Sequence, residues 1–279
     1  MRHHLGHMRR TAAGLRPDLD ARLIGLEQAS PAWAPWFALW RAAERARARA
    51  RTPSVTLSPA RDANAPRLHG GTLHVERRAV ERLLADLAAA ADVKWRDPSA
   101  AIPMLEGALR DTPASAAASS DDEAGRTAVL QFAVPVVLSG IGRSIHVQTG
   151  SWPHGYCPVC GAWPLRAELR GVERERHLRC GRCGADWTGS WLRCAYCGEQ
   201  DHERLGLLSS EGHLESRRVE TCASCRRYLK AFAVLAPADS LEMLLDDLET
   251  VELDLAARER GFARPDGSGY ALSVTVQAC

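Results

Sequence analysis

Four Cys-x-x-Cys pairs constrain the fold of this chain more than any other feature. The eight cysteines are Cys157 and Cys160, Cys180 and Cys183, Cys194 and Cys197, and Cys222 and Cys225. A Cys-x-x-Cys turn points both sulfurs toward one spot, and two facing turns form a tetrahedral cage that suits soft metals. The sequence therefore predicts two metal ions, iron or zinc, one in each four-cysteine site, with all eight paired cysteines as ligands.

The spacing of the pairs leaves two arrangements open. Successive pairs are separated by 19, 10 and 24 residues. We expect sequential pairing, in which the first two pairs form one ribbon and the last two form another. The alternative is an interleaved cross-brace, first with third and second with fourth. A glycine follows the second cysteine in three of the four pairs, where the backbone turns back toward the thiolates.

The start of the chain and its charge narrow the class of protein. Residues 11–20 contain no apolar run that could be the core of a signal peptide, and the longest apolar stretch, 128–138, is too short to cross a bilayer. We therefore expect a cytoplasmic protein without a membrane segment, where closely spaced cysteines more often hold metal than form disulfides. Lysine and arginine number 36 against 34 aspartates and glutamates, so no large field attracts nucleic acid.

Helical periodicity dominates the sequence outside the cysteine region. Apolar residues recur at helical spacing in two early segments, Trp36, Leu39, Trp40 and Ala43, and Val80, Leu83, Leu84 and Leu87. We interpret both sets as core faces and expect loops at 52–71 and 111–126. The predicted fold class is α plus small β, an N-terminal helical domain followed by tandem rubredoxin-like or zinc-ribbon metal modules and a C-terminal helix. The predicted boundaries are a flexible N-terminus at 1–12, the helical domain at 13–149, the ribbons at 150–236, and the helix with a tail at 237–279.

The last forty residues predict one long helix that packs on the helical domain. Leucines recur on one face from Leu241 to Leu255, and Asp239 with Glu242 resembles an N-terminal capping box. The final stretch, 266–279, is expected to be a weakly held tail, and Cys279 has no Cys-x-x-Cys partner.

Charged and aromatic residues near the cysteines receive structural interpretations. We expect a solvated face of arginines interleaved with glutamates, and we expect the nearby histidines to be surface residues. The tryptophans are expected to pack between the ribbons, which have little core of their own. The residues concerned are Arg166, Arg170, Arg174, Arg176, Arg179, Arg182 and Arg193 with Glu168, Glu173 and Glu175; His154, His177, His202 and His213; and Trp152, Trp163, Trp187 and Trp191.

Several segments in fixed order resemble the formate dehydrogenase accessory protein family, FdhE. They are Gly155 to Gly161, the Cys180 and Cys194 pairs, Glu220 to Lys230, and Leu253-Asp254 with Arg258 to Gly261. The resemblance covers about residues 150 to 265. It implies a cytoplasmic, non-catalytic factor that binds the catalytic subunit of a molybdenum or tungsten formate dehydrogenase and supports its maturation. It also implies two rubredoxin-like sites with all eight paired cysteines as ligands, and it gives Tyr228-Leu229-Lys230 no known role.

Two other classes of function remain as alternatives. A nucleic-acid-binding tandem zinc-ribbon protein would carry a basic stripe with exposed aromatics, whereas here glutamates alternate with arginines. An enzyme is disfavoured, because a four-sulfur cage leaves no open position for water, and we predict no catalytic residues and no further cofactor. We expect the partner surface in the cleft between the helical domain and the ribbons. A homo-oligomer is compatible with the sequence.

Overall fold

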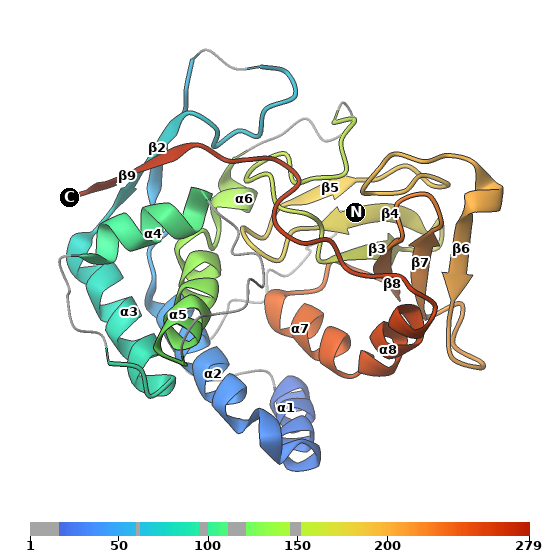
Figure 1. Cartoon of the computed structure of the whole chain (residues 1–279), viewed down its shortest axis with the longest axis horizontal. Helices are drawn as coiled ribbons and strands as arrows, with labels where there is room; N and C mark the ends of the chain where they lie inside the picture. The colour runs from blue at the N-terminus through green and yellow to red at the C-terminus, as the bar shows by residue number, and fades with distance from the viewer. Residues whose placement is uncertain (1–16, 60–61, 95–99, 111–120, 146–151) are drawn as a thin grey trace, which may run out of the picture.

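A computed structural model of the chain describes residues 17–59, 62–94, 100–110, 121–145 and 152–279. The predicted flexible N-terminus at 1–12 and the predicted domain boundary at 149 lie outside these ranges. The helical body is at one end of the molecule and the sheet that carries the cysteine pairs is at the other (Figure 1).

Helices form most of the body. They are α1 (Pro17–Ala29), a short 3₁₀ turn (Pro31–Trp33), α2 (Ala34–Arg49), α3 (Arg77–Ala90), α4 (Ala101–Arg110), α5 (Asp121–Val137) and α6 (Ile141–Ser144). Helices α2, α3 and α5 pack against one another, and α4 packs on α5. The predicted face of α3 is buried from Val80 to Leu87, and on α2 Leu39, Trp40 and Ala43 are buried while Trp36 is partly buried. The helical period therefore identified the core faces correctly.

The body also holds a three-stranded sheet that corrects the prediction for the C-terminus. Strands β1 (Ser54–Thr56) and β2 (Gly71–Val75) pair antiparallel, and β9 (Val274–Ala278) pairs parallel with β2. Leu272, Val274 and Val276 are buried, so residues 272–278 are not a weakly held tail. The segment 52–71 likewise includes a strand, and α5 begins at Asp121, inside the predicted loop at 111–126, whose residues 111–120 lie outside the described ranges.

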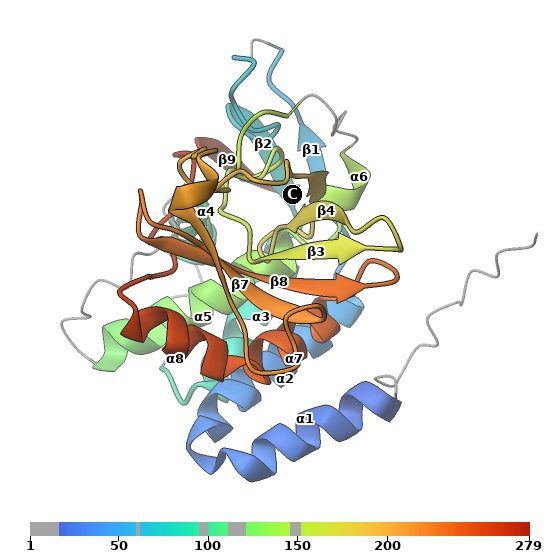
Figure 2. The same cartoon turned by 90° about the vertical axis from the view of Figure 1, so that its right-hand side faces the viewer.

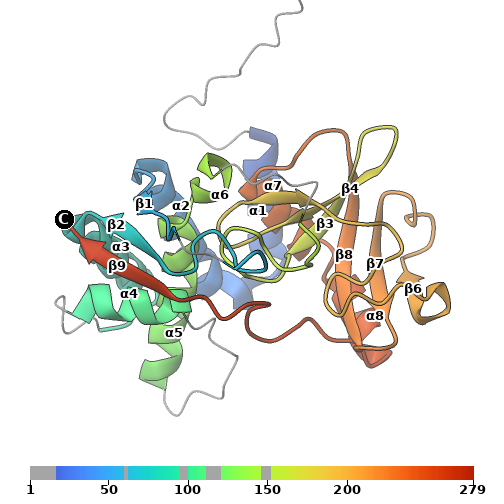
Figure 3. The same ribbon diagram turned by 90° about the horizontal axis from the view of Figure 1, so that it is seen from above.

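The cysteine region forms a six-stranded sheet in the order β5-β4-β3-β8-β7-β6. Its strands are β3 (Arg166–Arg170), β4 (Glu175–Arg179), β5 (Asp186–Thr188), β6 (Leu205–Leu208), β7 (Arg217–Cys222) and β8 (Arg227–Val234), with a 3₁₀ turn at His202–Arg204 before β6. Each ribbon contributes one antiparallel set of three strands, and the parallel pair β3 and β8 joins them. The two ribbons therefore share one continuous sheet, with β6 and β7 far from the helical body (Figure 3).

The predicted long C-terminal helix is two helices, α7 (Ser240–Leu248) and α8 (Val251–Glu259), because the backbone leaves the helical conformation at Thr250. The capping box of Asp239 and Glu242 is confirmed. Helix α7 packs on α1 through Leu241 and Leu245, whereas α8 packs on β7. Both helices lie below the sheet in Figure 2, between it and α1. None of the described helices is both long and apolar enough to cross a bilayer.

Candidate metal centres

All four Cys-x-x-Cys pairs adopt the same backbone turn. In each, the N–H of the residue after the second cysteine donates to the carbonyl of the first, and that residue has a positive φ. The donors are Gly161, Gly184, Gly198 and Arg226, with φ of 75°, 76°, 78° and 57°, at N···O distances of 2.9, 3.2, 3.1 and 2.9 Å. Glycine adopts this left-handed conformation without strain, which explains why three of the pairs carry it. Arg226 occupies the same conformation without that freedom.

The turns bring the eight cysteine sulfurs into two groups of four. Cluster 1 contains Cys157, Cys160, Cys180 and Cys183, and cluster 2 contains Cys194, Cys197, Cys222 and Cys225. Sequential pairing is therefore confirmed over the interleaved arrangement. Both clusters are candidate metal centres, and the predicted ligand residues are the ones that the fold gathers.

The sulfur separations in both clusters fit a tetrahedral metal. The Sγ atoms of Cys157 and Cys183 are 3.6 Å apart, and those of Cys160 and Cys180 are 3.5 Å apart. In cluster 2 the Sγ atoms of Cys194 and Cys225, and of Cys197 and Cys222, are each 3.7 Å apart. Four thiolates at tetrahedral bond lengths around Zn²⁺ would lie about 3.8 Å from one another. Each cluster could thus hold one metal ion.

The electrostatics of the clusters also favour a bound cation. Burial raises the pKa of the Cys157 thiol, and burial raises the pKa of Cys194 to about 11. Hydrogen bonds from the Cys157 thiol and its neighbours lower the pKa of Cys180. Four thiolates at this distance repel one another. A divalent ion would offset that repulsion and displace the protons of the cysteine thiols.

Cluster 1 is built into the junction between the body and the sheet. Its four cysteines are buried within the main hydrophobic core, together with residues of α3, α4 and α5. The N–H groups of Arg67 and Leu68 donate to the carbonyls of Pro158 and Val159, inside the first cysteine pair. The guanidinium of Arg182, inside the second pair, donates to the carbonyls of Ala108 and Leu109 at the end of α4. Both turns of cluster 1 are therefore bonded to the helical body.

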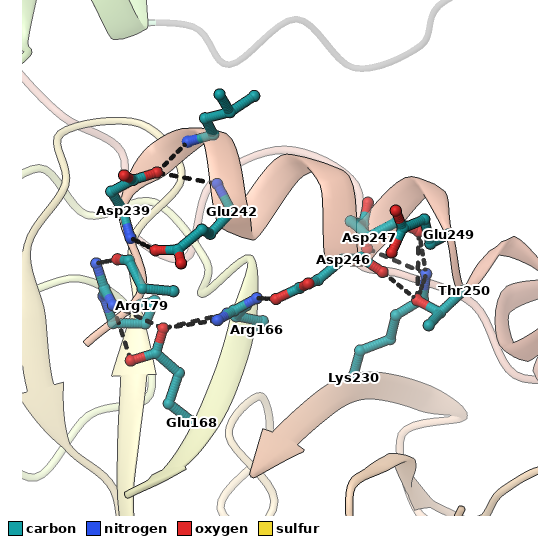
Figure 4. Close-up of polar contacts among 12 residues, drawn as sticks. Arg166, Glu168, Arg179, Lys230, Asp239, Glu242, Asp246, Asp247, Glu249 and Thr250 are labelled. Atoms are coloured by element: carbon teal, nitrogen blue, oxygen red, sulfur yellow. Dashed lines mark hydrogen bonds and ion pairs between the residues drawn. The ribbon is translucent and has the colours of Figure 1, made fainter. Parts of the chain in front are cut away.

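The prediction that the arginines form a solvated face is wrong for the central ones. Glu168 is fully buried, Arg166 is 1% exposed, and Arg179 is also buried. The Glu168 carboxylate accepts from Arg166 Nη2 at 2.9 Å, from Arg179 Nη1 at 2.7 Å and from Arg170 Nη2 at 2.5 Å. Arg166 also donates to Asp246 on α7 at 2.7 Å (Figure 4). These charges form a buried network between the sheet and α7.

Burial and charge act in opposite directions on Glu168. Burial alone would raise the pKa of its carboxyl group, but the guanidinium groups of Arg179 and Arg166 outweigh burial and hold that pKa below its ordinary value. Glu168 is therefore ionised at neutral pH.

Lys230 gives the Tyr228-Leu229-Lys230 motif a structural role. The buried Nζ of Lys230 is 2.5 Å from Asp254 Oδ2 on α8 and 3.1 Å from Asp247 Oδ1 on α7. The hydroxyl of Tyr228 donates to Asp254 at 2.6 Å, and Leu229 lies in the main core. The motif fastens β8 to the α7–α8 junction. One sequence signal pointed to it, because Lys230 is the only lysine after residue 150.

The remaining predicted residues divide between core and surface. Trp187 is buried, and Trp163 contacts Tyr196 of the other ribbon edge-on with ring centroids 5.3 Å apart, but Trp191 is 46% exposed and does not fit the packing prediction. Within the described residues, neither sulfur cluster includes a histidine: His177 contacts Asp186 and His154 contacts Asn64.

The fold and the two sites define a class of protein in which a helical body is joined to two four-cysteine ribbons. Residues 192–269 match the family described as FdhE, C-terminal domain. Among curated relatives, the "Protein FdhE homolog" of Pseudomonas aeruginosa is 32% identical over 49% of this chain, and that of Edwardsiella ictaluri is 30% identical over 66% of it. These matches show that the chain is similar to the FdhE family, as its cysteine motifs predict.

The chain matches only part of the length of these relatives. The matches span 45% of the length of the Pseudomonas relative and 63% of that of the Edwardsiella relative. A solved structure, the crystal structure of the FdhE protein from Pseudomonas aeruginosa, has a TM-score of 0.53 and 22% identity, and the match covers 91% of this chain and 94% of that one. That likeness confirms the fold.

The strained turn at Arg226 yields a prediction. Its guanidinium donates to the carbonyls of Arg260 and Gly261 at the end of α8 and lies 4.4 Å from the ring centroid of Phe262. Arg226→Ala should lose these contacts and keep a positive φ, whereas Arg226→Gly should lose the contacts but relieve strain of about 1 kcal/mol. We expect the alanine variant to be the less stable by that margin in urea unfolding of the metal-loaded chain. Equal stability would mean that the turn stores no strain.

Proposed function

We propose that this chain is a non-catalytic, cytoplasmic accessory factor that binds the catalytic subunit of a formate dehydrogenase and supports its maturation. The observation that carries the proposal is the pair of four-cysteine clusters, the second of which lies within the region that matches the FdhE C-terminal domain. Two closed cages of four sulfurs offer no open coordination position for a substrate, which supports a binding role over a hydrolytic one. The burial of Arg166, Arg176 and Arg179 in ion pairs removes them from any basic stripe for nucleic acid.

A cavity between the helical body and the ribbons is the proposed partner surface. It has a volume of about 370 Å³ and is bounded by α5, the first ribbon, β8 and the segment before β9. Its walls include Leu130 and Val134 from the body, Trp163 and Tyr196 from the ribbon loops, and Leu229 from β8. Aromatic and aliphatic walls of this kind can bury an apolar side chain of a partner.

The test is capture of a formate dehydrogenase catalytic subunit by the tagged chain, with two matched variants of α5. Gln131→Arg places a long charged side chain at the exposed edge of the cavity, and Ala124→Arg places the same group on the same helix away from it. We expect Gln131→Arg to weaken binding about tenfold or more, a loss of roughly 1.4 kcal/mol, and Ala124→Arg to bind as the unchanged chain does.

Three results would count against the proposal. Equal binding by both variants would show that the cavity is not the surface that binds the partner. Failure of the unchanged chain to capture the subunit would show that the formate dehydrogenase subunit is not its partner. Recovery of nucleic acid in its place would favour the ribbon-protein alternative.

A further inference from the structure

We propose that the two clusters differ in kind, and that cluster 2 is an exchangeable site which passes its metal ion to an anionic chelating ligand while cluster 1 keeps its own. The proposal takes both clusters to be metal sites and does not depend on the formate dehydrogenase role. It arises from where the two clusters lie in the fold and from a pocket that reaches only one of them.

The cysteines of cluster 1 are buried, whereas most cysteines of cluster 2 are exposed or partly exposed. All four cysteines of cluster 1 are buried, and none exposes more than 1% of its surface. In cluster 2 Cys197 is exposed, Cys194 and Cys225 are partly exposed, and only Cys222 is buried. An incoming ligand must touch the metal before a thiolate leaves, so exposure of the ligand sulfurs sets the access to each site. Cluster 2 has that access without any change in the fold.

The surroundings of the clusters follow the same division. The turns of cluster 1 are bonded to Arg67, Leu68 and the end of α4, so its sulfurs are covered by the helical body. The turns of cluster 2 lie between β5 and β6 and between β7 and β8, on the half of the sheet away from the helical body (Figure 3). Apart from the sulfur contacts, the Ser224 hydroxyl donates to Glu199 at 2.5 Å across the two turns, and Arg226 of the second turn is bonded to the end of α8 rather than to the helical body. Opening cluster 1 therefore requires the core to separate, whereas opening cluster 2 requires only a local movement.

A pocket of about 200 Å³ leads to cluster 2 from the side of β6 and β7. Cys194 and Cys222 form part of its wall. The charged side chains on that wall are Arg176, Arg193, Arg218, Arg227 and Glu220. Arg176 pairs with Glu220 at 2.7 Å, so the positive charge of the wall comes from Arg193, Arg218 and Arg227, and the pocket favours an anionic ligand.

The rim of this pocket is apolar and exposed. Trp191 is 46% exposed and Leu192 is 69% exposed, and Leu192 has a φ of 49°. A leucine in the left-handed region is strained, which is a feature that clusters at binding sites. The rim and the arginines together suit a chelator that carries both carboxylates or thiolates and an apolar part.

The exchange itself is a ligand substitution. Each cysteine sulfur that leaves the metal is replaced by one donor atom of the incoming chelator, and the departing thiolate takes a proton from solvent. Neither the metal nor the sulfur changes oxidation state. The exposed Cys197 is the sulfur best placed to leave first.

The first test uses the full chain reconstituted with two Zn²⁺ ions and treated with iodoacetamide, with alkylated positions followed by mass spectrometry. We expect Cys194, Cys197 and Cys225 to be alkylated at least on the order of tenfold faster than Cys157, Cys160, Cys180 and Cys183. Cys279, an exposed thiol outside both clusters, serves as the internal standard. Equal alkylation of the two clusters, or faster alkylation of cluster 1, would overturn the proposal.

The second test measures metal release to 4-(2-pyridylazo)resorcinol. We expect two phases of equal size, the first at least on the order of tenfold faster than the second, and we expect Cys197→Ser to abolish the fast phase while leaving the slow one. The variant Arg218→Gln, which removes one pocket charge without touching a ligand, should slow the fast phase for this anionic chelator but not for a neutral one. A single phase, or a fast phase that survives in Cys197→Ser, would contradict the assignment.

Discussion

Changing Cys160 to serine is expected to destabilise the helical body together with the first ribbon. The four sulfurs of cluster 1 lie in the same hydrophobic core as Leu84, Leu105 and Val129 of the helices. A structural four-cysteine site contributes on the order of 10 kcal/mol to folding, as much as the whole stability of an ordinary domain. The loss of one ligand should therefore remove most of the folding free energy that the metal contributes. The unfolding midpoint and the helical circular dichroism signal should both fall.

Two variants make this expectation specific. Cys197→Ser removes one ligand from cluster 2, whose cysteines are not part of the main core, and should leave the helical signal largely intact. Cys279→Ser changes an exposed thiol that belongs to neither cluster and should have no effect. Cys160→Ser could instead show the same helical signal and the same unfolding midpoint as Cys279→Ser. In that case cluster 1 would not stabilise the helical body. Removal of the metal with a strong chelator should reproduce the order of the two cluster variants.

The metal ligands could be predicted from the sequence because their geometry is local. A Cys-x-x-Cys turn closes within five residues, and the hydrogen bond from Gly161 to Cys157 depends on nothing outside that turn. The capping box at Asp239 and Glu242 is local in the same way. Helical spacing predicted the buried face of α3 because a helix repeats its faces regardless of what packs there.

The features that the sequence did not reveal depend on contacts between distant residues. Strand β9 is ordered by β2, which lies about two hundred residues earlier in the chain, as the pairing of Gly71 with Val274 shows. Arg166 and Glu173 stand in the same run of alternating charges, yet Arg166 is buried because Asp246 of α7 lies against it. Charge alternation is the same for an exposed face and for a buried network, so the pattern alone could not separate them.

The Glu168 carboxylate is expected to be the most costly single charge to remove. Glu168→Gln would keep the shape of the side chain but remove the carboxylate that Arg179 contacts at 2.7 Å, leaving the buried Arg179 with Asp186 at 3.8 Å as its carboxylate partner. Arg166 and Arg170 would retain Asp246 and Asp186 as partners. Breaking a buried ion pair by removing one member costs about 3–5 kcal/mol, and we expect a loss in that range in urea unfolding.

The matched control is Glu173→Gln, a change of the same chemistry at an exposed position in the same ribbon. It should alter the free energy of unfolding by no more than about 0.5 kcal/mol. A similar small cost for both substitutions would show that the arginines find other partners and that the Glu168 charge contributes little.

The pH dependence of this difference gives the Glu168 prediction a second, independent measurement. The folded protein holds the pKa of Glu168 below that of the unfolded chain, which is about 4.3 for a glutamate. The stability contributed by its charge is therefore fully present above the unfolded pKa and is lost as pH falls through the folded pKa. Glu168→Gln lacks this titration, so the gap in stability between it and the unchanged chain should be constant near neutral pH and narrow below about pH 4. Metal loss at low pH affects both proteins, so the difference in stability between them reports on Glu168. A difference that stayed constant into acid would mean that the arginines do not hold the carboxylate ionised.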